Sequence, residues 1–227
     1  MSAFFRVAWI VMKKDLTVEV RSLEIVSTTI FFAVTVVLMF SFGLVVEGRA
    51  VPDVAPAILW IAIAFSGTLA LGRTFERERI NDTLRALLLA PSERAALYVG
   101  KLAGILLLLA LVQLILVPLV GLLFNAPILT YPGRLLLLLL AGSVGFCAVG
   151  TVFAAMLGRA RSRDVLLPVM LYPMTIPVMI AGVRGTAALL QPEPDLAIAQ
   201  FWIALLGFID VVFVTLALWT FDPVMTD

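Results

Sequence analysis

Six apolar runs dominate the sequence, and each is long enough to cross a lipid bilayer as a helix. A helix needs about 20 apolar residues to span the hydrocarbon core, because each residue advances it by only about 1.5 Å. The runs cover approximately residues 25–46, 54–72, 102–124, 135–157, 165–183 and 201–221. We therefore predict an all-α integral membrane protein with six transmembrane helices.

Composition agrees with one membrane domain over residues 1–227. The chain is 63% apolar and 14% charged, whereas soluble domains have about 45–50% apolar and about 25% charged residues. The longest polar stretch has roughly 30 residues, which is below the usual size of a folded domain. The net charge is +1, so nothing indicates a nucleic-acid partner.

The chemistry available to this chain is limited by what the sequence lacks. It has no histidine, and its single cysteine, Cys147, lies in an apolar run, which excludes an internal disulfide and a cysteine metal cluster. It also has no Walker A loop, nucleotide fingerprint, serine elbow or HExxH motif. We predict a non-catalytic subunit with no directly bound cofactor or metal, and ATP chemistry would have to come from another chain.

The first residues predict an amphipathic helix on the membrane surface, over residues 4–21. Its length and its seven charges before the first apolar run are unlike a cleavable signal peptide. Two interpretations are open: a basic anchor, or an elbow helix that fixes the angle of the first span. The predicted apolar face holds Phe5, Trp9, Met12, Leu16 and Val20, and the polar face holds Arg6, Lys13, Thr17 and Arg21.

The distribution of basic residues predicts the orientation. With six spans, thirteen of the sixteen Lys and Arg residues lie on the side of the two termini, and the opposite loops hold Arg49, Arg134 and Arg184. Cytoplasmic loops carry the excess of basic residues. Both termini and the segment 73–101 are therefore expected in the cytoplasm.

The segment 73–101 is a charged, helix-forming insert between two apolar spans, and it holds six Lys and Arg residues. Asn81 or Asp82 can cap a short helix that Pro91 closes. Such a helix would present Leu84, Leu87 and Leu88 on one side. It is either a solvated loop or a docking helix that presses these leucines into a groove.

The fifth span contains Pro168, Pro173 and Pro177. Interior prolines remove backbone donors, so we expect this span to be kinked or partly unwound, or else simply bent within a bundle. The polar composition of residues 184–200 predicts an external segment after this span that dips back toward the membrane interface.

Two further features concern contacts within the membrane. Asp210 lies midway along the sixth span, where an ionised carboxylate is costly; it is either a proton or substrate contact, or a packing residue that faces Gln113, Thr215 or another span. Gly142, Gly145 and Gly150 permit close helix contact and could form a dimer face.

Two blocks carry a family resemblance: APAILWIAIAFSGTLALGRTFERERINDTLRALLLAPSERAALYVGK at residues 55–101, and LLPVMLYPMTIPVMIAG at residues 166–182. The chain resembles the CcmB family over nearly its whole length. CcmB proteins are permease subunits of the haem-exporter ABC transporter of cytochrome c maturation. The C-terminal FDPVMTD departs from the family pattern, so no role is assigned to this tail.

The resemblance implies an ABC-2 type permease of the bacterial inner membrane, paired as a homodimer with two copies of the cytoplasmic ATPase CcmA. It also implies association with the haem-handling membrane protein CcmC, the helper CcmD and the periplasmic haem chaperone CcmE. ATP and haem would be handled by these partners, and ATP turnover would release the haem-loaded chaperone.

By the same resemblance, the insert is the coupling helix that fits a cleft in the ATPase. The expected coupling residues are Phe75, Glu76, Arg79, Asp82, Leu84, Leu87, Leu88 and Pro91. Conformational roles are expected for Pro168, Pro173, Pro177 and Asp210.

Three other functions remain open at the level of the sequence. An ABC-2 permease could export another cargo, such as a drug, a lipid or a polysaccharide. A membrane-embedded enzyme could use Asp210 as its acid or base, and a pure scaffold could gather the maturation proteins without any need for ATP turnover.

Overall fold

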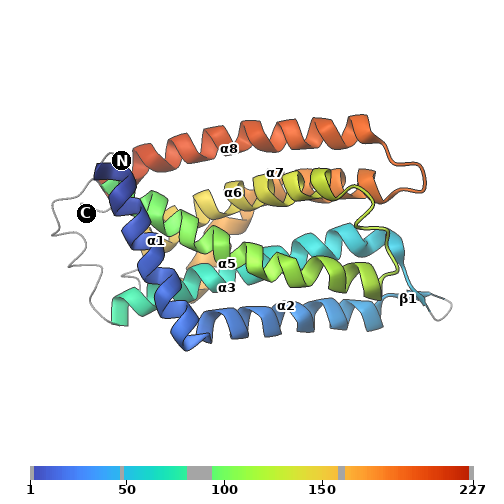
Figure 1. Cartoon of the computed structure of the whole chain (residues 1–227), viewed down its shortest axis with the longest axis horizontal. Helices are drawn as coiled ribbons and strands as arrows, with labels where there is room; N and C mark the ends of the chain where they lie inside the picture. The colour runs from blue at the N-terminus through green and yellow to red at the C-terminus, as the bar shows by residue number, and fades with distance from the viewer. Residues whose placement is uncertain (1–2, 47–48, 81–93, 158–161, 225–227) are drawn as a thin grey trace.

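The computed structural model describes residues 3–46, 49–80, 94–157 and 162–224, and consists mainly of long helices that lie side by side (Figure 1). A two-residue antiparallel strand pair and a short 3-10 helix join the second helix to the third. In chain order the elements are α1 (Ala3–Ser22), α2 (Glu24–Gly43), β1 (Val45–Val46), β2 (Arg49–Ala50), η1 (Pro52–Val54), α3 (Ala55–Ile80), α5 (Arg94–Leu123), α6 (Pro132–Met156), α7 (Arg163–Leu190) and α8 (Leu196–Val224).

The prediction of six membrane-spanning helices is confirmed. Within the described part of the chain, six helices are long and apolar enough to cross a bilayer. Their bounds differ from the apolar runs, because hydropathy marks where a chain enters lipid and not where a helix ends. Thus α3 continues to Ile80 beyond the predicted end at residue 72, α5 begins at Arg94, and the first span stops at Gly43 before the strand pair.

The segment 184–200, which we predicted to be an external segment, is mostly helical. Helix α7 extends to Leu190, and α8 begins at Leu196. The Asp195 carboxylate starts α8, because its Oδ1 atom accepts hydrogen bonds from the backbone N–H groups of Ala197 (3.0 Å) and Ile198 (2.9 Å). The connection between these helices is therefore only residues 191–195.

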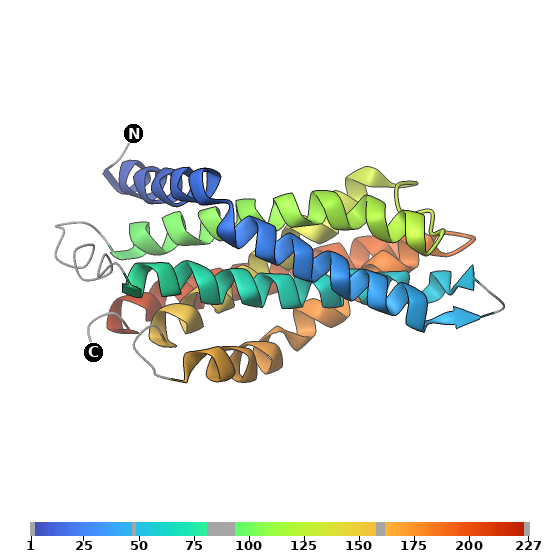
Figure 2. The same cartoon turned by 90° about the horizontal axis from the view of Figure 1, so that it is seen from below.

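Helix α7 is continuous through its three prolines, so the prediction of partial unwinding is wrong. Pro173 and Pro177 are exposed, so their rings lie on the outer side of the helix. Figure 2 shows the first half of α7 diverging from the bundle, while the second half returns to it. A bent helix is the outcome that interior prolines usually produce.

The core surrounds α3, which packs against α2, α5, α6 and α7. Trp60 of α3 is fully buried, and its Nε1–H donates to Thr186 Oγ1 of α7 at 3.0 Å. Its ring lies against Gly142 of α6 and Gly182 of α7, where any Cβ atom would overlap it. Close helix approach at small residues is the main source of packing energy in a bilayer, because lipid is as apolar as the side chains.

Gly142, Gly145 and Gly150 of α6 do not form the dimer face that their spacing suggested. All three are buried within this chain. Gly142 faces Trp60 and Gly150 faces Leu71 of α3, while Gly145 faces Asp210 of α8. They serve packing between helices of one chain, and any homodimer must use another surface.

Candidate functional site

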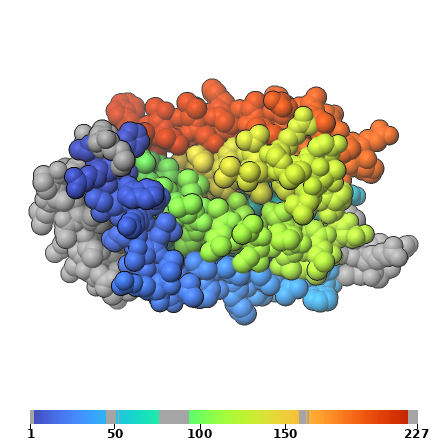
Figure 3. All heavy atoms as spheres, in the orientation of Figure 1, coloured from blue at the N-terminus to red at the C-terminus, as the bar shows by residue number. Residues whose placement is uncertain are grey.

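Helix α1 lies across one end of the bundle, at a steep angle to α2 (Figure 1). The same end holds the last residues of α3 and the first of α5, and in the space-filling view α1 forms a ridge over it (Figure 3). The turn from α1 into α2 is made by Leu23, which adopts a left-handed conformation with φ 53°. This geometry favours the elbow interpretation of the N-terminal helix.

The side of α1 that contacts the bundle is not its large apolar face. The buried residues are Ala8, Val11 and Glu19. Ala8 and Val11 pack on α5 beside Gly100, where a Cβ atom would lie 2.8 Å from Val11 Cβ. The predicted apolar face stays largely outside, with Trp9 57% exposed. An exposed aromatic face is typical of a helix that lies in the membrane interface.

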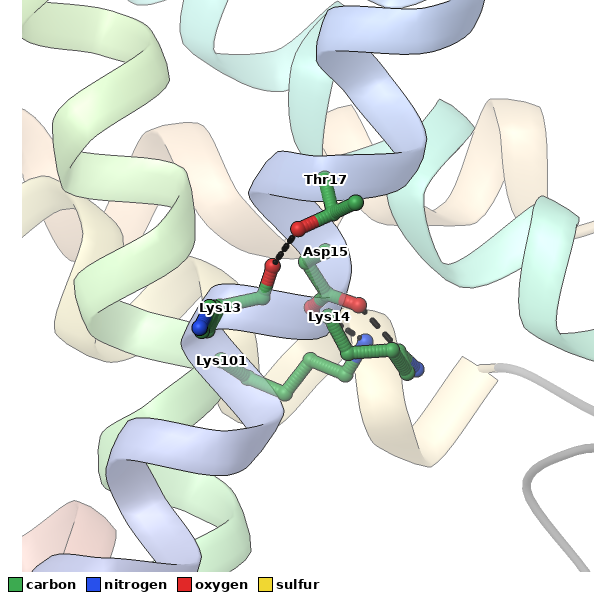
Figure 4. Close-up of polar contacts among 5 residues, drawn as sticks. All are labelled: Lys13, Lys14, Asp15, Thr17 and Lys101. Atoms are coloured by element: carbon green, nitrogen blue, oxygen red, sulfur yellow. Dashed lines mark hydrogen bonds and ion pairs between the residues drawn. The ribbon is translucent and has the colours of Figure 1, made fainter.

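A buried ion pair joins α1 to α5 (Figure 4). The Lys101 ammonium lies 2.7 Å from Asp15 Oδ2, and the Lys101 side chain is only 5% exposed. Lys14 contacts the other oxygen, Asp15 Oδ1, at 3.0 Å. Lys101 Nζ also lies 5.8 Å from the ring centroid of Phe75, which adds a cation–π contact with α3.

The junction of α1 with α2 has a second polar contact. Glu19 Oε1 accepts a hydrogen bond from the backbone N–H of Val26 at 2.8 Å, which satisfies a free donor in the first turn of α2. Together with the Lys101–Asp15 pair, this contact fixes α1 to α2 and α5 at the end of the bundle where residues 81–93 connect α3 to α5. The pair is partly buried, with the Lys101 side chain 5% and the Asp15 side chain 17% exposed. Because breaking it is expected to cost up to about 3 kcal/mol, movement of the start of α5 is expected to carry α1 with it.

The structure describes part of the predicted coupling residues. Phe75 is buried at this junction. Glu76 and Arg79 belong to the last turns of α3, and only their backbone is described. The remaining predicted coupling residues lie outside the described residues, so the groove-binding face stays a prediction: Asp82, Leu84, Leu87, Leu88 and Pro91.

The first proline of α7 lies in a separate place. Pro168 lines a cavity of about 380 Å³ between α2, α3 and α7. Tyr172 and Phe65 meet there edge to face with centroids 5.7 Å apart, and Thr68 Oγ1 donates to the Tyr172 hydroxyl at 3.3 Å. Tyr172 is thus a packing residue with a hydroxyl partner, at the place where α7 diverges.

Asp210 of α8 faces α6 and α7. Its Oδ1 atom would lie 2.7 Å from a Cβ atom built on Gly145, and Val178 of α7 borders the same point. This oxygen is buried without a hydrogen-bond partner among the described residues. Gln113, one of the partners that we considered, instead donates to Ser143 Oγ at 2.6 Å. Asp210 therefore lies between helices and apart from the ion-paired junction.

Sequence reasoning missed the ion pair because Lys101 was counted with the cations of the insert. A signal was present: Lys101 lies between Gly100 and Gly104, in a helix that is otherwise apolar. Small neighbours let another helix approach, and a buried lysine needs a carboxylate. The amphipathic helix offered two carboxylates, Asp15 and Glu19, and the structure pairs Lys101 with Asp15. No group of three or more metal-ligating side chains occurs among residues 3–46, 49–80, 94–157 and 162–224.

These features define a multi-pass helical membrane protein with an amphipathic helix across one end. The family described as CcmB protein matches residues 6–225, and the chain belongs to this family.

The chain is also similar to three curated proteins, each named Heme exporter protein B. The Pseudomonas aeruginosa protein is 27% identical over 77% of this chain and 78% of its own length. The Haemophilus influenzae protein is 26% identical over 75% and 76%. The Rhodobacter capsulatus protein is 27% identical over 82% and 86%.

Proposed function

We propose that this chain is the membrane-spanning permease subunit of a haem-exporting ABC transporter that acts in cytochrome c maturation. The observation that carries the proposal is the CcmB match over residues 6–225, together with relatives named Heme exporter protein B. The bundle of six membrane-length helices supports a transport subunit. The chain itself is non-catalytic in this proposal.

The end of the bundle that carries α1 is the proposed coupling end. The segment 73–101 would contact the cytoplasmic ATPase, and the Lys101–Asp15 pair and Phe75 would pass its movement to α1, α3 and α5. The excess of basic residues supports a cytoplasmic location for this end and for both termini, in the bacterial inner membrane.

The other predicted residues would act in the conformational change. The bend of α7 at Pro168, Pro173 and Pro177 gives that helix a place to pivot. Asp210 lies against α6 and beside α7, where a change in its protonation would alter helix contact. ATP and haem would be held by partner subunits.

The proposed partners are an ATPase like CcmA, membrane proteins like CcmC and CcmD, and a periplasmic haem chaperone like CcmE. ATP turnover would serve to release the haem-loaded chaperone from an assembly that contains two copies of this chain. The exposed sides of α7 and α8 leave surface for such contacts.

The test is a haem stain of membrane proteins from cells that lack this chain, with and without the gene restored. Selective loss of covalently bound haem that returns on complementation supports the proposal. An unchanged stain would overturn the haem assignment and leave an ABC-2 permease for another cargo.

The variant Asp210→Asn distinguishes a permease subunit from a membrane-embedded enzyme. If Asp210 were the essential acid or base, this variant would abolish cytochrome maturation. The proposal predicts that maturation persists at a changed rate, because the amide keeps the shape of the side chain.

A scaffold without ATP coupling is distinguished by a different variant. Such a scaffold would still support cytochrome maturation with an ATPase partner that cannot hydrolyse ATP.

A further inference from the structure

The second half of α7 is fixed between three helices. Gly182 lies under the Trp60 ring of α3, where any Cβ atom would overlap the ring. A Cβ atom on Gly185 would lie 2.5 Å from Leu138 of α6 and 3.1 Å from Trp202 of α8. Because groups packed this closely cannot move independently, this half of α7 moves only with the bundle.

The first half of α7, residues 164–172, is packed less closely and lies over a cavity. Within this range only Leu167 and Leu171 are buried, while Val165 is 68% and Val169 is 62% exposed. A volume of about 380 Å³ separates this half from α2 and α3, at the place where Figure 2 shows α7 diverging from the bundle. We call residues 164–172 the arm.

The two halves meet at Pro173 and Pro177, where the helix is easiest to bend. Proline has no backbone N–H, so the carbonyl groups of Val169 and Pro173 have no helical donor one turn later. Between the two prolines, Thr175 Oγ1 donates to the Leu171 carbonyl at 3.0 Å, a type of contact that often bends helices. This stretch is therefore a hinge between the fixed half and the arm.

Three aromatic rings, one from each neighbouring helix, line the cavity near the hinge: Phe32 of α2, Phe65 of α3 and Tyr172 of α7. The Phe32 and Phe65 rings are 6.3 Å apart, and the Phe65 and Tyr172 rings are 5.7 Å apart, both edge to face. Phe65 is 44% exposed although α3 is mostly buried, so the cavity opens between α2 and α7. Edge-to-face pairs stay favourable over about 4.5–7 Å, so these rings tolerate movement of the arm.

The gap between the arm and α3 widens away from the hinge. Thr68 contacts the Tyr172 hydroxyl at 3.3 Å. As the second and fifth spans, α3 and α7 run in opposite directions, so one turn further along each helix Gly72 lies opposite Pro168, and both line the cavity. A Cβ atom on Gly72 would nevertheless meet nothing within 4 Å. The arm therefore has room to approach α3.

We propose that the arm closes onto α3 by bending at Pro173 and Pro177. Closure brings Pro168 against Gly72 and removes the cavity, while Tyr172 keeps its contacts as the pivot. In a bilayer, lipid chains fill an open cavity at little cost, and closing it gains helix packing, so the two states are close in free energy. The proposed pivot of α7 thus becomes a movement of one defined half toward one defined surface.

Disulfide trapping in the full chain, reconstituted in nanodiscs, tests the closure. The Cβ atoms of a disulfide lie about 3.8 Å apart, so a bridge between Gly72→Cys and Pro168→Cys requires the arm to approach α3. Gly72→Cys with Gly207→Cys is the matched control, because Gly207 also has open space but lies on α8, which packs on α5, α6 and α7. Alkylation of the remaining thiols measures the bridged fraction.

We expect the bridge between positions 72 and 168 to form at least about tenfold faster than the control bridge, because the closed state is a populated minor state. Equally slow oxidation of both pairs would overturn the proposal.

A second measurement leaves the hinge and Pro168 intact. Spin labels on exposed Phe31 of α2 and Val169 of the arm report the movement, and labels on exposed Met39 and Ile180 report the fixed half. We expect two distances for the first pair and one for the second. Gly72→Trp should remove the shorter distance of the first pair by filling the cavity. A single distance for the first pair that Gly72→Trp does not change would contradict closure.

The link between the arm and ATP turnover rests on the proposed function and is tested separately. Phe75 lies one turn beyond Gly72 on α3 and contacts Lys101 at the ion-paired junction, so the cavity and the junction share one stretch of α3. Bridging positions 72 and 168 should lower the ATPase activity of the assembled complex at least about tenfold, and dithiothreitol should restore it. A bridge that leaves ATPase activity unchanged would overturn this link but not the arm, whereas a chain that assembles with no ATPase would overturn the proposed function.

Discussion

Helices α3 and α8 are both apolar and membrane-spanning, yet 72% of the spanning part of α3 is buried and only 11% of that of α8. In water such a difference would reflect hydrophobicity, but lipid accepts apolar side chains as readily as a protein core does. What separates the two helices is the partner surface. The Trp60 ring of α3 fits against glycines of α6 and α7, whereas α8 turns Phe201, Phe208 and Trp219 outward.

The largest expected effect concerns one tryptophan of each of these helices, Trp60 of α3 and Trp219 of α8. Trp60→Ala should lower the free energy of unfolding by about 3 kcal/mol, which is the lower end of the range for truncating a buried aromatic side chain. The transfer of the ring to lipid costs little, but the cavity that it leaves in the protein still destabilises the fold. Trp60→Ala also leaves Thr186 without its partner. Trp219→Ala should change the free energy of unfolding by less than about 0.5 kcal/mol.

Unfolding by SDS titration in mixed micelles measures both tryptophan variants. Equal losses of unfolding free energy in Trp60→Ala and Trp219→Ala would mean that the outward face of α8 is packed as tightly as the core.

The ion pair at the α1 end gives the next prediction. Asp15→Asn should destabilise by up to about 3 kcal/mol, because the buried Lys101 ammonium loses its counter-charge. Combining it with Lys101→Met should restore much of the loss, since an apolar residue leaves no uncompensated charge. Protease sensitivity of α1 and the same SDS titration report the effect, and a double variant no better than Asp15→Asn alone would argue against the pair.

Two glycines give the smallest and most discriminating effect. Gly182→Ala places a methyl group in the Trp60 ring and should destabilise by about 1–3 kcal/mol. Gly207→Ala meets open space on α8 and should stabilise by about 0.5–1 kcal/mol through helix propensity. Opposite signs in thermal unfolding support the comparison, and a stabilised Gly182→Ala would contradict it.

The number of spans could be predicted from the sequence because bilayer thickness fixes the length of an apolar run. The ends of the helices could not be predicted in this way, because hydropathy does not indicate that Asp195 starts α8 or that α3 continues past Gly72. The glycines of α6 were recognised as contact points, but their partners depend on which helices are neighbours, and no periodicity contains that information.

The candidate site was predictable only in part. The charged insert identifies one end of the bundle, and its cations predict the side of the membrane. The pairing of Asp15 with Lys101 joins residues 86 positions apart, and it depends on how α1 crosses α5. For Asp210 the sequence left open a proton or substrate contact or a packing residue, and its place against Gly145 follows from the packing of α8 on α6.

In the proposed function, ATPase coupling takes place at the end of the bundle that carries α1. The most direct measurement compares the same substitution at both ends, Leu87→Asp in the insert and Leu129→Asp in the exposed connection between α5 and α6. We expect both variants to enter the membrane, and only Leu87→Asp to lose co-purification with the ATPase and cytochrome maturation. Normal assembly and maturation in Leu87→Asp, or an equal loss in Leu129→Asp, would contradict the account.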